Sequence, residues 1–162
     1  MGALGLLSGM RRTALGLLVC VGGAACSDLG PETLLAELER NQSRWEATRP
    51  ASYVFAIERL CFCGVESRGP VRVRVQGTAV VERIYVDTGG SVPPALAELF
   101  PTVDGLFALV RSAIEDGAYE VRVMYHAVLG VPIDIWIDYI ENAIDDELGV
   151  TVTESVEAPA GA

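Results

Sequence analysis

The segment Pro132–Ile140, PIDIWIDYI, alternates between two sets of side chains along its length. In an extended chain, successive side chains point to opposite faces. One face then carries Ile133, Ile135, Ile137 and Tyr139, and the other carries Asp134, Trp136, Asp138 and Ile140. This pattern is typical of a strand with one face on the core and one toward water. We therefore predict that the three isoleucines are covered and that Asp134 and Asp138 face out.

Other segments with strand character lie on both sides of this one. They are residues 52–62, 71–75, 80–86, 119–125 and 150–156. Residues 71–75, VRVRV, alternate strictly, with Val expected on the core side and Arg in water. Gln76-Gly77-Thr78 follows as a hairpin signal. The chain thus contains two sets of three predicted strands.

Two amphipathic helices are predicted, one before each set of strands. The first opens at Gly30-Pro31-Glu32 and ends at Arg49-Pro50. The second runs from a capping Thr102 to Asp116, with Gly117 in a left-handed exit position. The order α-βββ-α-βββ favours an α+β fold for a single domain over residues 31–156. We expect two layers, a mostly antiparallel sheet with both helices on one face.

The charge is strongly acidic and unevenly distributed. The 162 residues carry a formal net charge of −10, from 22 acidic residues and 12 basic ones, and every basic residue is Arg. This balance disfavours nucleic acid as a partner, because binding that polyanion needs a basic surface. Residues 101–162 hold 12 of the acids and only Arg111 and Arg122. Such a field would attract a basic envelope protein to the C-terminal half, although it also serves solubility.

The first 25 residues resemble a signal peptide. Arg11-Arg12 precede a short apolar run, and small residues lead to Cys26. The run is too short to cross a bilayer; Met10 is an alternative start. The end Gly23-Ala24-Ala25-Cys26 resembles a bacterial lipobox, which predicts a lipid on Cys26; plain secretion after Ala25 is the alternative. We expect an exported protein with a lipidated tether at residues 26–30, held on a periplasmic or outer membrane surface by acyl chains. Residues 157–162 are expected to form a flexible tail.

Cys61 and Cys63 are the only other cysteines after Cys26. Export to an oxidising compartment favours a disulfide between them. Two residues apart in a flat strand their Cα atoms would be about 6.5–7 Å apart, near the limit for a disulfide, so bonding would bend the strand end. Free thiols, a metal site and redox activity are the alternatives.

The remaining candidates are single or clustered polar residues. His126 is the only histidine, and with Cys61 and Cys63 it could form a zinc site only if the fold brought the three together. Asp138, Asp145, Asp146 and Glu147 are weak candidates for calcium, but they do not fit the calcium-loop pattern. We find no catalytic constellation and predict no cofactor.

Several motifs in order resemble a family of uncharacterised bacterial lipoproteins. They are Tyr53, Cys61-Phe62-Cys63, Tyr125, Gly130-Val131-Pro132, Asp138 and Asp145-Asp146-Glu147. The chain departs from the family pattern at Val131, where Tyr is frequent, and at His126, where Asp or Asn is usual. The resemblance implies the location and the fold, and the family has no assigned activity. The sequence thus favours a non-enzymatic, membrane-tethered binding or structural module, with a thiol-redox or metal-handling lipoprotein based on Cys61 and Cys63 as the alternative.

Overall fold

The computed structural model describes residues 30–157. The predicted signal peptide, Cys26 with the tether up to Leu29, and the tail from Ala158 lie outside the described residues. Two helices and six strands follow one another in the predicted order: α1 (Pro31–Thr48), β1 (Ser52–Leu60), β2 (Val71–Gln76), β3 (Ala79–Tyr85), α2 (Val103–Glu115), β4 (Glu120–Tyr125), β5 (Pro132–Asp138) and β6 (Leu148–Glu157). Short 3-10 turns occur at Val65–Ser67 and Pro94–Leu99.

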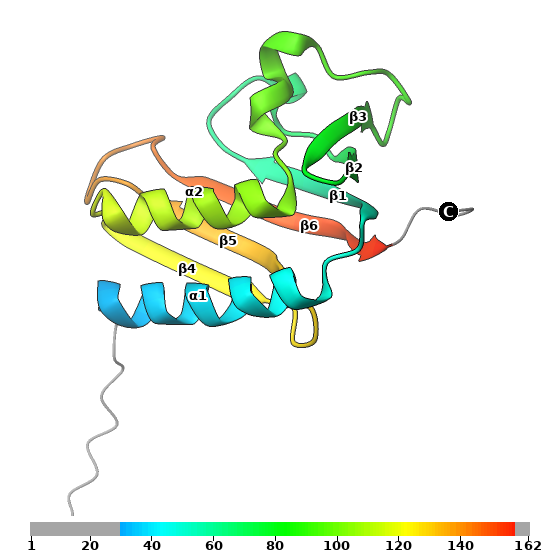
Figure 1. Ribbon diagram of the computed structural model, residues 1–162. Helices are drawn as coiled ribbons and strands as arrows, with labels where there is room; N and C mark the ends of the chain where they lie inside the picture. Colours follow the sequence, from blue (N-terminus) through cyan, green and yellow to red (C-terminus); the bar gives the residue numbers. More distant parts are fainter. Residues whose placement is uncertain (1–29, 158–162) are drawn as a thin grey trace, which may run out of the picture.

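The six strands form one antiparallel sheet in the order β3-β2-β1-β6-β5-β4. The first strand of the first set therefore pairs with the last strand of the second set. Figure 1 shows α1 and α2 side by side over one face of this sheet. The predicted two-layer α+β fold is confirmed. None of the helices between residues 30 and 157 is long and apolar enough to span a membrane.

The core lies between the helices and the sheet. In β2 the Val side chains are buried and the Arg side chains are exposed, as their alternation predicts. In β5, Ile135 and Ile137 are buried, whereas Asp134 is exposed. Ile133 is only partly buried and lines a shallow hollow with Leu129. The face assignment of the deciding strand is thus confirmed at its centre.

Polar contacts stabilise the start of α2 and join it to α1. Within α2, the Thr102 side chain caps the helix by accepting a hydrogen bond from the Gly105 amide at 3.1 Å. The Trp45 indole N–H donates to the carboxylate of Asp104 at 2.8 Å, and Arg49 pairs with the same carboxylate. Trp45 itself is buried edge-on against Tyr53. The helices therefore form one unit above the sheet.

Two predicted strands end earlier than the sequence pattern suggests. β1 stops at Leu60 rather than Phe62, because Cys61 and Cys63 are bonded and their Cα atoms are drawn to 5.3 Å. β5 stops at Asp138 rather than Ile140; the turn that follows holds Asn142 and Asp145 in left-handed conformations. β6 runs from Leu148 to Glu157 and so extends beyond the predicted residues 150–156 at both ends.

Candidate functional site: a groove beside the edge strand

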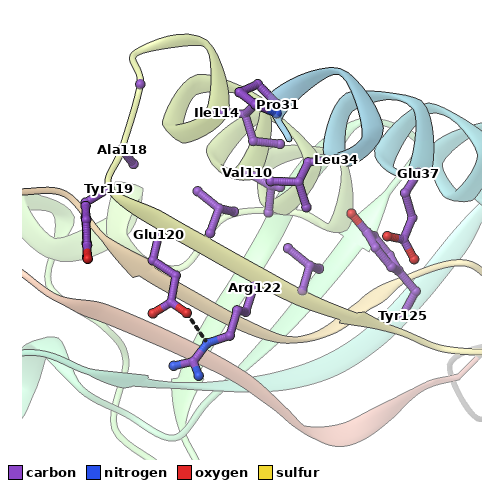
Figure 2. A pocket seen from close by; sticks show the side chains of 13 residues that line it. Pro31, Leu34, Glu37, Val110, Ile114, Ala118, Tyr119, Glu120, Arg122 and Tyr125 are labelled. Atoms are coloured by element: carbon purple, nitrogen blue, oxygen red, sulfur yellow. Dashed lines mark ion pairs between the residues drawn. The ribbon is translucent and has the colours of Figure 1, made fainter. Parts of the chain in front are cut away.

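A groove of about 380 Å³ lies between α1, the end of α2 and β4. Its lining is mainly apolar: Pro31, Leu34, Val110, Ile114, Ala118, Val121 and Val123. Figure 2 shows Leu34, Val110 and Ile114 above β4, facing the inner side of that strand. The groove can therefore accept apolar side chains.

The groove exists because α1 packs on α2 rather than on the neighbouring edge strand. β4 is the last strand of the sheet and pairs with β5 alone. The side of β4 that faces away from β5 consequently has no strand partner among residues 30–157. Such an edge offers backbone N–H and C=O groups to an added strand.

Tyr125 supplies a polar group within the apolar lining. Its ring stacks on Phe107, with the ring centroids 6.4 Å apart. Burial raises the pKa of the Tyr125 hydroxyl, and the negative charge of Glu37 raises it further. The phenol thus stays protonated and can donate a hydrogen bond. Glu37 lies at the same end of the groove in Figure 2.

The charged residues of β4 point away from the groove. Glu120 and Arg122 lie on the other side of the strand in Figure 2, and the Arg122 Nε is 3.5 Å from the Glu120 Oε1. Arg122 also lies over the ring of Trp136, 5.7 Å from its centroid. This alternation gives β4 an apolar side toward the helices and an outer side that carries Glu120 and Arg122.

A second hollow continues the groove along α1 and is polar. It is lined by Glu37, Arg40, Asn41, Arg44, Val123, Met124 and Tyr125. Arg44 donates hydrogen bonds to the side chain of Asn41 at 3.0 Å and to the Ala127 carbonyl at 3.3 Å. The trough thus changes from apolar near Pro31 to basic near Arg40 and Arg44.

The predicted cysteine pair lies outside this groove, on the turn after β1, a strand that β6 and β5 separate from β4. Cys61 and Cys63 are bonded to each other, as predicted. The guanidinium of Arg68 donates to the Cys63 carbonyl at 2.8 and 3.1 Å. Between the two cysteines, Phe62 is 79% exposed. The pair thus shapes a surface turn.

Replacing both cysteines by Ser is expected to lower stability by only about 1–2 kcal/mol, because a disulfide across so short a loop removes little entropy from the unfolded chain. Denaturant unfolding of the C61S/C63S protein measures this. Alkylation with and without reductant, read by mass spectrometry, checks the starting protein. If both thiols label freely without reductant in protein from its own membrane, the pairing is contradicted and the metal alternative gains support.

The other predicted ligands do not come together. His126 lies at the opposite end of the sheet from Cys61, and its Nδ1 accepts hydrogen bonds from the backbone amides of Val128 and Leu129. Asp138 ends β5, and Asp145, Asp146 and Glu147 follow in the connection to β6. Within residues 30–157, no three His, Cys, Asp or Glu side chains are grouped to hold a metal ion.

Asp146 is the one member of this acidic set with an unusual environment. Both of its carboxylate oxygens are buried, and they have no hydrogen-bond partner within the described part of the chain. Buried carboxylates are normally hydrogen-bonded. The sequence carried no signal for this, since Asp146 lies in a run of three acids that reads as a solvated turn.

Sequence reasoning missed the groove. The sequence predicts a helix that contains Pro31 and Leu34 and a strand that contains Val121, Val123 and Tyr125, but nothing local indicates that the two flank a hollow. The position of β4 at the sheet edge was the missing information.

Comparison with known proteins gives one family. The model described as "Family of unknown function (DUF6174)" matches residues 37–157. No curated protein and no solved structure matches the chain.

Proposed function

The chain belongs to the DUF6174 family of unknown function, and on that premise we propose that it is a lipid-anchored envelope protein whose domain binds an extended segment of a partner protein along β4. The observation that carries the proposal is the apolar groove beside an unpaired edge strand. The partner strand would hydrogen-bond to the β4 backbone and place alternate side chains in the groove. Binding of this kind needs no catalytic group.

The residues that line the groove indicate which side chains the bound partner segment would carry. Apolar side chains would fill the space between Leu34, Val110 and Val123. The Tyr125 hydroxyl would donate to a polar group of the segment. Glu37 would favour a basic residue of the segment at the Tyr125 end of the groove, and Arg40 would favour an acidic group farther along α1. A partner with basic residues also fits the acidic C-terminal half, which supplies β4.

Part of the acidity of that half is neutralised within the domain. Arg49 pairs with Asp104, Arg72 with Glu154 at 2.6 Å, and Arg122 with Glu120. Hydrogen bonding to Arg72 lowers the pKa of the Glu154 carboxyl. The long-range attraction of a basic partner would then come from acids of this half that form no ion pair with Arg within residues 30–157, such as Asp134 and Asp138.

The anchor is proposed from the sequence: Arg11-Arg12, the apolar run and Ala24-Ala25-Cys26. It agrees with the likeness to bacterial lipoproteins in the Cys-x-Cys and Gly-x-Pro motifs. The thiol-redox alternative would use Cys61 and Cys63 on their exposed turn, and the alkylation experiment above tests it.

Photocrosslinking in the native envelope tests the binding proposal. A benzoylphenylalanine at Val123 should give a discrete adduct with one protein, whereas the same probe at Val81, a half-exposed valine on the other edge strand β3, should not. Leu34→Arg should abolish the Val123 adduct by placing a long charged side chain in the groove. An adduct pattern that is the same from both positions would refute the groove as the binding site.

The anchor is tested in the same cells. The mature protein should be heavier than its peptide by a diacylglycerol and should enter the detergent phase, whereas Cys26→Ser protein should stay in the aqueous phase. Detergent partitioning of the Cys26→Ser protein would contradict the anchor without touching the groove.

A further inference from the structure

Large apolar side chains are exposed at one end of the domain. They are Leu60, Phe62, Val65, Tyr119, Ile140 and Ile144, which we call the apolar end. Ile144 is 86% exposed and Phe62 is 79% exposed. Scattered exposed apolar residues are ordinary, but several large ones gathered on connecting turns mark a contact surface.

Hydrogen bonds and strand register show that these turns are neighbours. Leu60 pairs with Gly149, so the end of β1 lies beside the start of β6. Ile137 pairs with Leu148, which places the β5–β6 connection at the same end. The Tyr119 amide donates to the Tyr139 carbonyl at 3.3 Å, so the α2–β4 turn joins them.

The chain enters the domain at this same end. Pro31, the first residue of α1, lines the groove together with Gly117 and Tyr119 of the α2–β4 turn. Figure 1 shows the start of α1 next to the end of α2, with the β5–β6 connection beyond it. Any group attached shortly before Pro31 is therefore held close to Tyr119, on the side of the apolar end that borders β4.

We propose that the apolar end inserts into the interfacial layer of the bilayer that holds the lipid of Cys26. The inference rests on the proposed anchor. Four residues after Cys26 the chain reaches Gly30, and four residues span at most about 14 Å even when fully extended. The bilayer is thus the surface nearest to this end. Apolar side chains of peripheral proteins sit roughly 5–10 Å deep at the boundary of headgroups and acyl chains.

The turns at this end are held in shape. The Cys61–Cys63 bond closes the turn that presents Phe62, and Arg68 binds the Cys63 carbonyl. Asn142 and Asp145 hold left-handed conformations on either side of Ile144. Turns that are ordered before contact lose less conformational entropy on insertion.

Acidic residues on these turns indicate which lipid headgroups are compatible with insertion of the apolar end. Glu66, Glu141 and Asp145 are exposed on the same connections as Val65, Ile140 and Ile144. Anionic headgroups would repel them over about a Debye length. The apolar end therefore suits zwitterionic headgroups such as phosphatidylethanolamine and phosphatidylcholine.

Depth-dependent fluorescence quenching tests this on the full lipidated protein in phosphatidylethanolamine–phosphatidylcholine vesicles. A nitrobenzoxadiazole label on Cys at position 144 (Ile144→Cys) should be quenched several-fold more by lipids with a nitroxide at the headgroup boundary than the same label at position 81 (Val81→Cys). Adding phosphatidylglycerol should reduce the difference. A Phe62→Ser change should reduce the quenching of the label at 144 while the protein stays anchored.

The outcomes separate this inference from the proposed function. If the protein is anchored through Cys26 and the two labels are quenched equally, the apolar end does not touch lipid and serves a protein contact instead. If phosphatidylglycerol increases the quenching at 144, the lipid assignment is contradicted. If Cys26→Ser protein binds the vesicles like the lipidated protein, the anchor itself is wrong.

Discussion

Replacing Gly130 by Ala is expected to cost about 2–5 kcal/mol of unfolding free energy. Gly130 has a φ of +74°, where an L side chain costs about 1–2 kcal/mol. A Cβ at this position would also collide with the Asn41 carbonyl oxygen of α1 and lie 3.1 Å from the Arg44 Cβ. Overpacking of this kind adds about 1–3 kcal/mol to the loss of unfolding free energy. Chemical denaturation monitored by circular dichroism measures the loss.

Gly117→Ala is the matched control. Gly117 has nearly the same φ, +76°, and a Cβ there would meet nothing within 4 Å. The Gly117→Ala protein should therefore lose only the part of the unfolding free energy that comes from the left-handed backbone conformation, about 1–2 kcal/mol. Equal losses from the two variants would show that α1 does not approach the Gly130 turn as closely as described.

Ile135→Ala is expected to lose on the order of 2–5 kcal/mol, as large-to-small changes in a packed core do. Ile135 is 2% exposed and pairs with Val123 on one side and Val150 on the other. Its replacement leaves a cavity under the helices, which the surrounding side chains fill only in part.

The comparison for this variant is Ile144→Ala. It deletes the same atoms from a side chain in solvent and should change stability by less than about 0.5 kcal/mol. A loss below about 0.5 kcal/mol for Ile135→Ala in the same denaturation experiment would mean that the covered face of β5 has been assigned wrongly.

Most of the secondary structure could be predicted because its causes are local. Thr102 caps α2, Gly117 follows the helix with a positive φ, and the valines of β2 are buried while its arginines are exposed. Each of these follows from side-chain chemistry within a few residues. The bounds differ by one or two residues at strand ends, as at β1, which stops at Leu60 where the Cys61–Cys63 bond turns the chain.

The groove beside β4 could not be predicted from the sequence. The sequence predicted the strand that holds Val121, Val123 and Tyr125, and the helix that holds Leu34, but not the groove between them. The groove depends on α1 packing on α2 and on β4 being the edge of the sheet. Both are contacts between segments far apart in the chain, for which periodicity carries no information.

By itself, the sequence determined where the two helices and six strands lie to within about two residues, which side of β2 and of the centre of β5 faces the core, and that the chain is acidic. These properties depend on steric preferences and on the burial of apolar side chains, which act along short stretches. Only the tertiary structure decided that β1 pairs with β6, that β4 is left at the edge, and that the turns carrying Phe62, Tyr119 and Ile144 lie at the same end of the sheet. The physical reason is that strand order is selected by the total apolar surface buried across the whole domain, and any one strand is compatible with several neighbours.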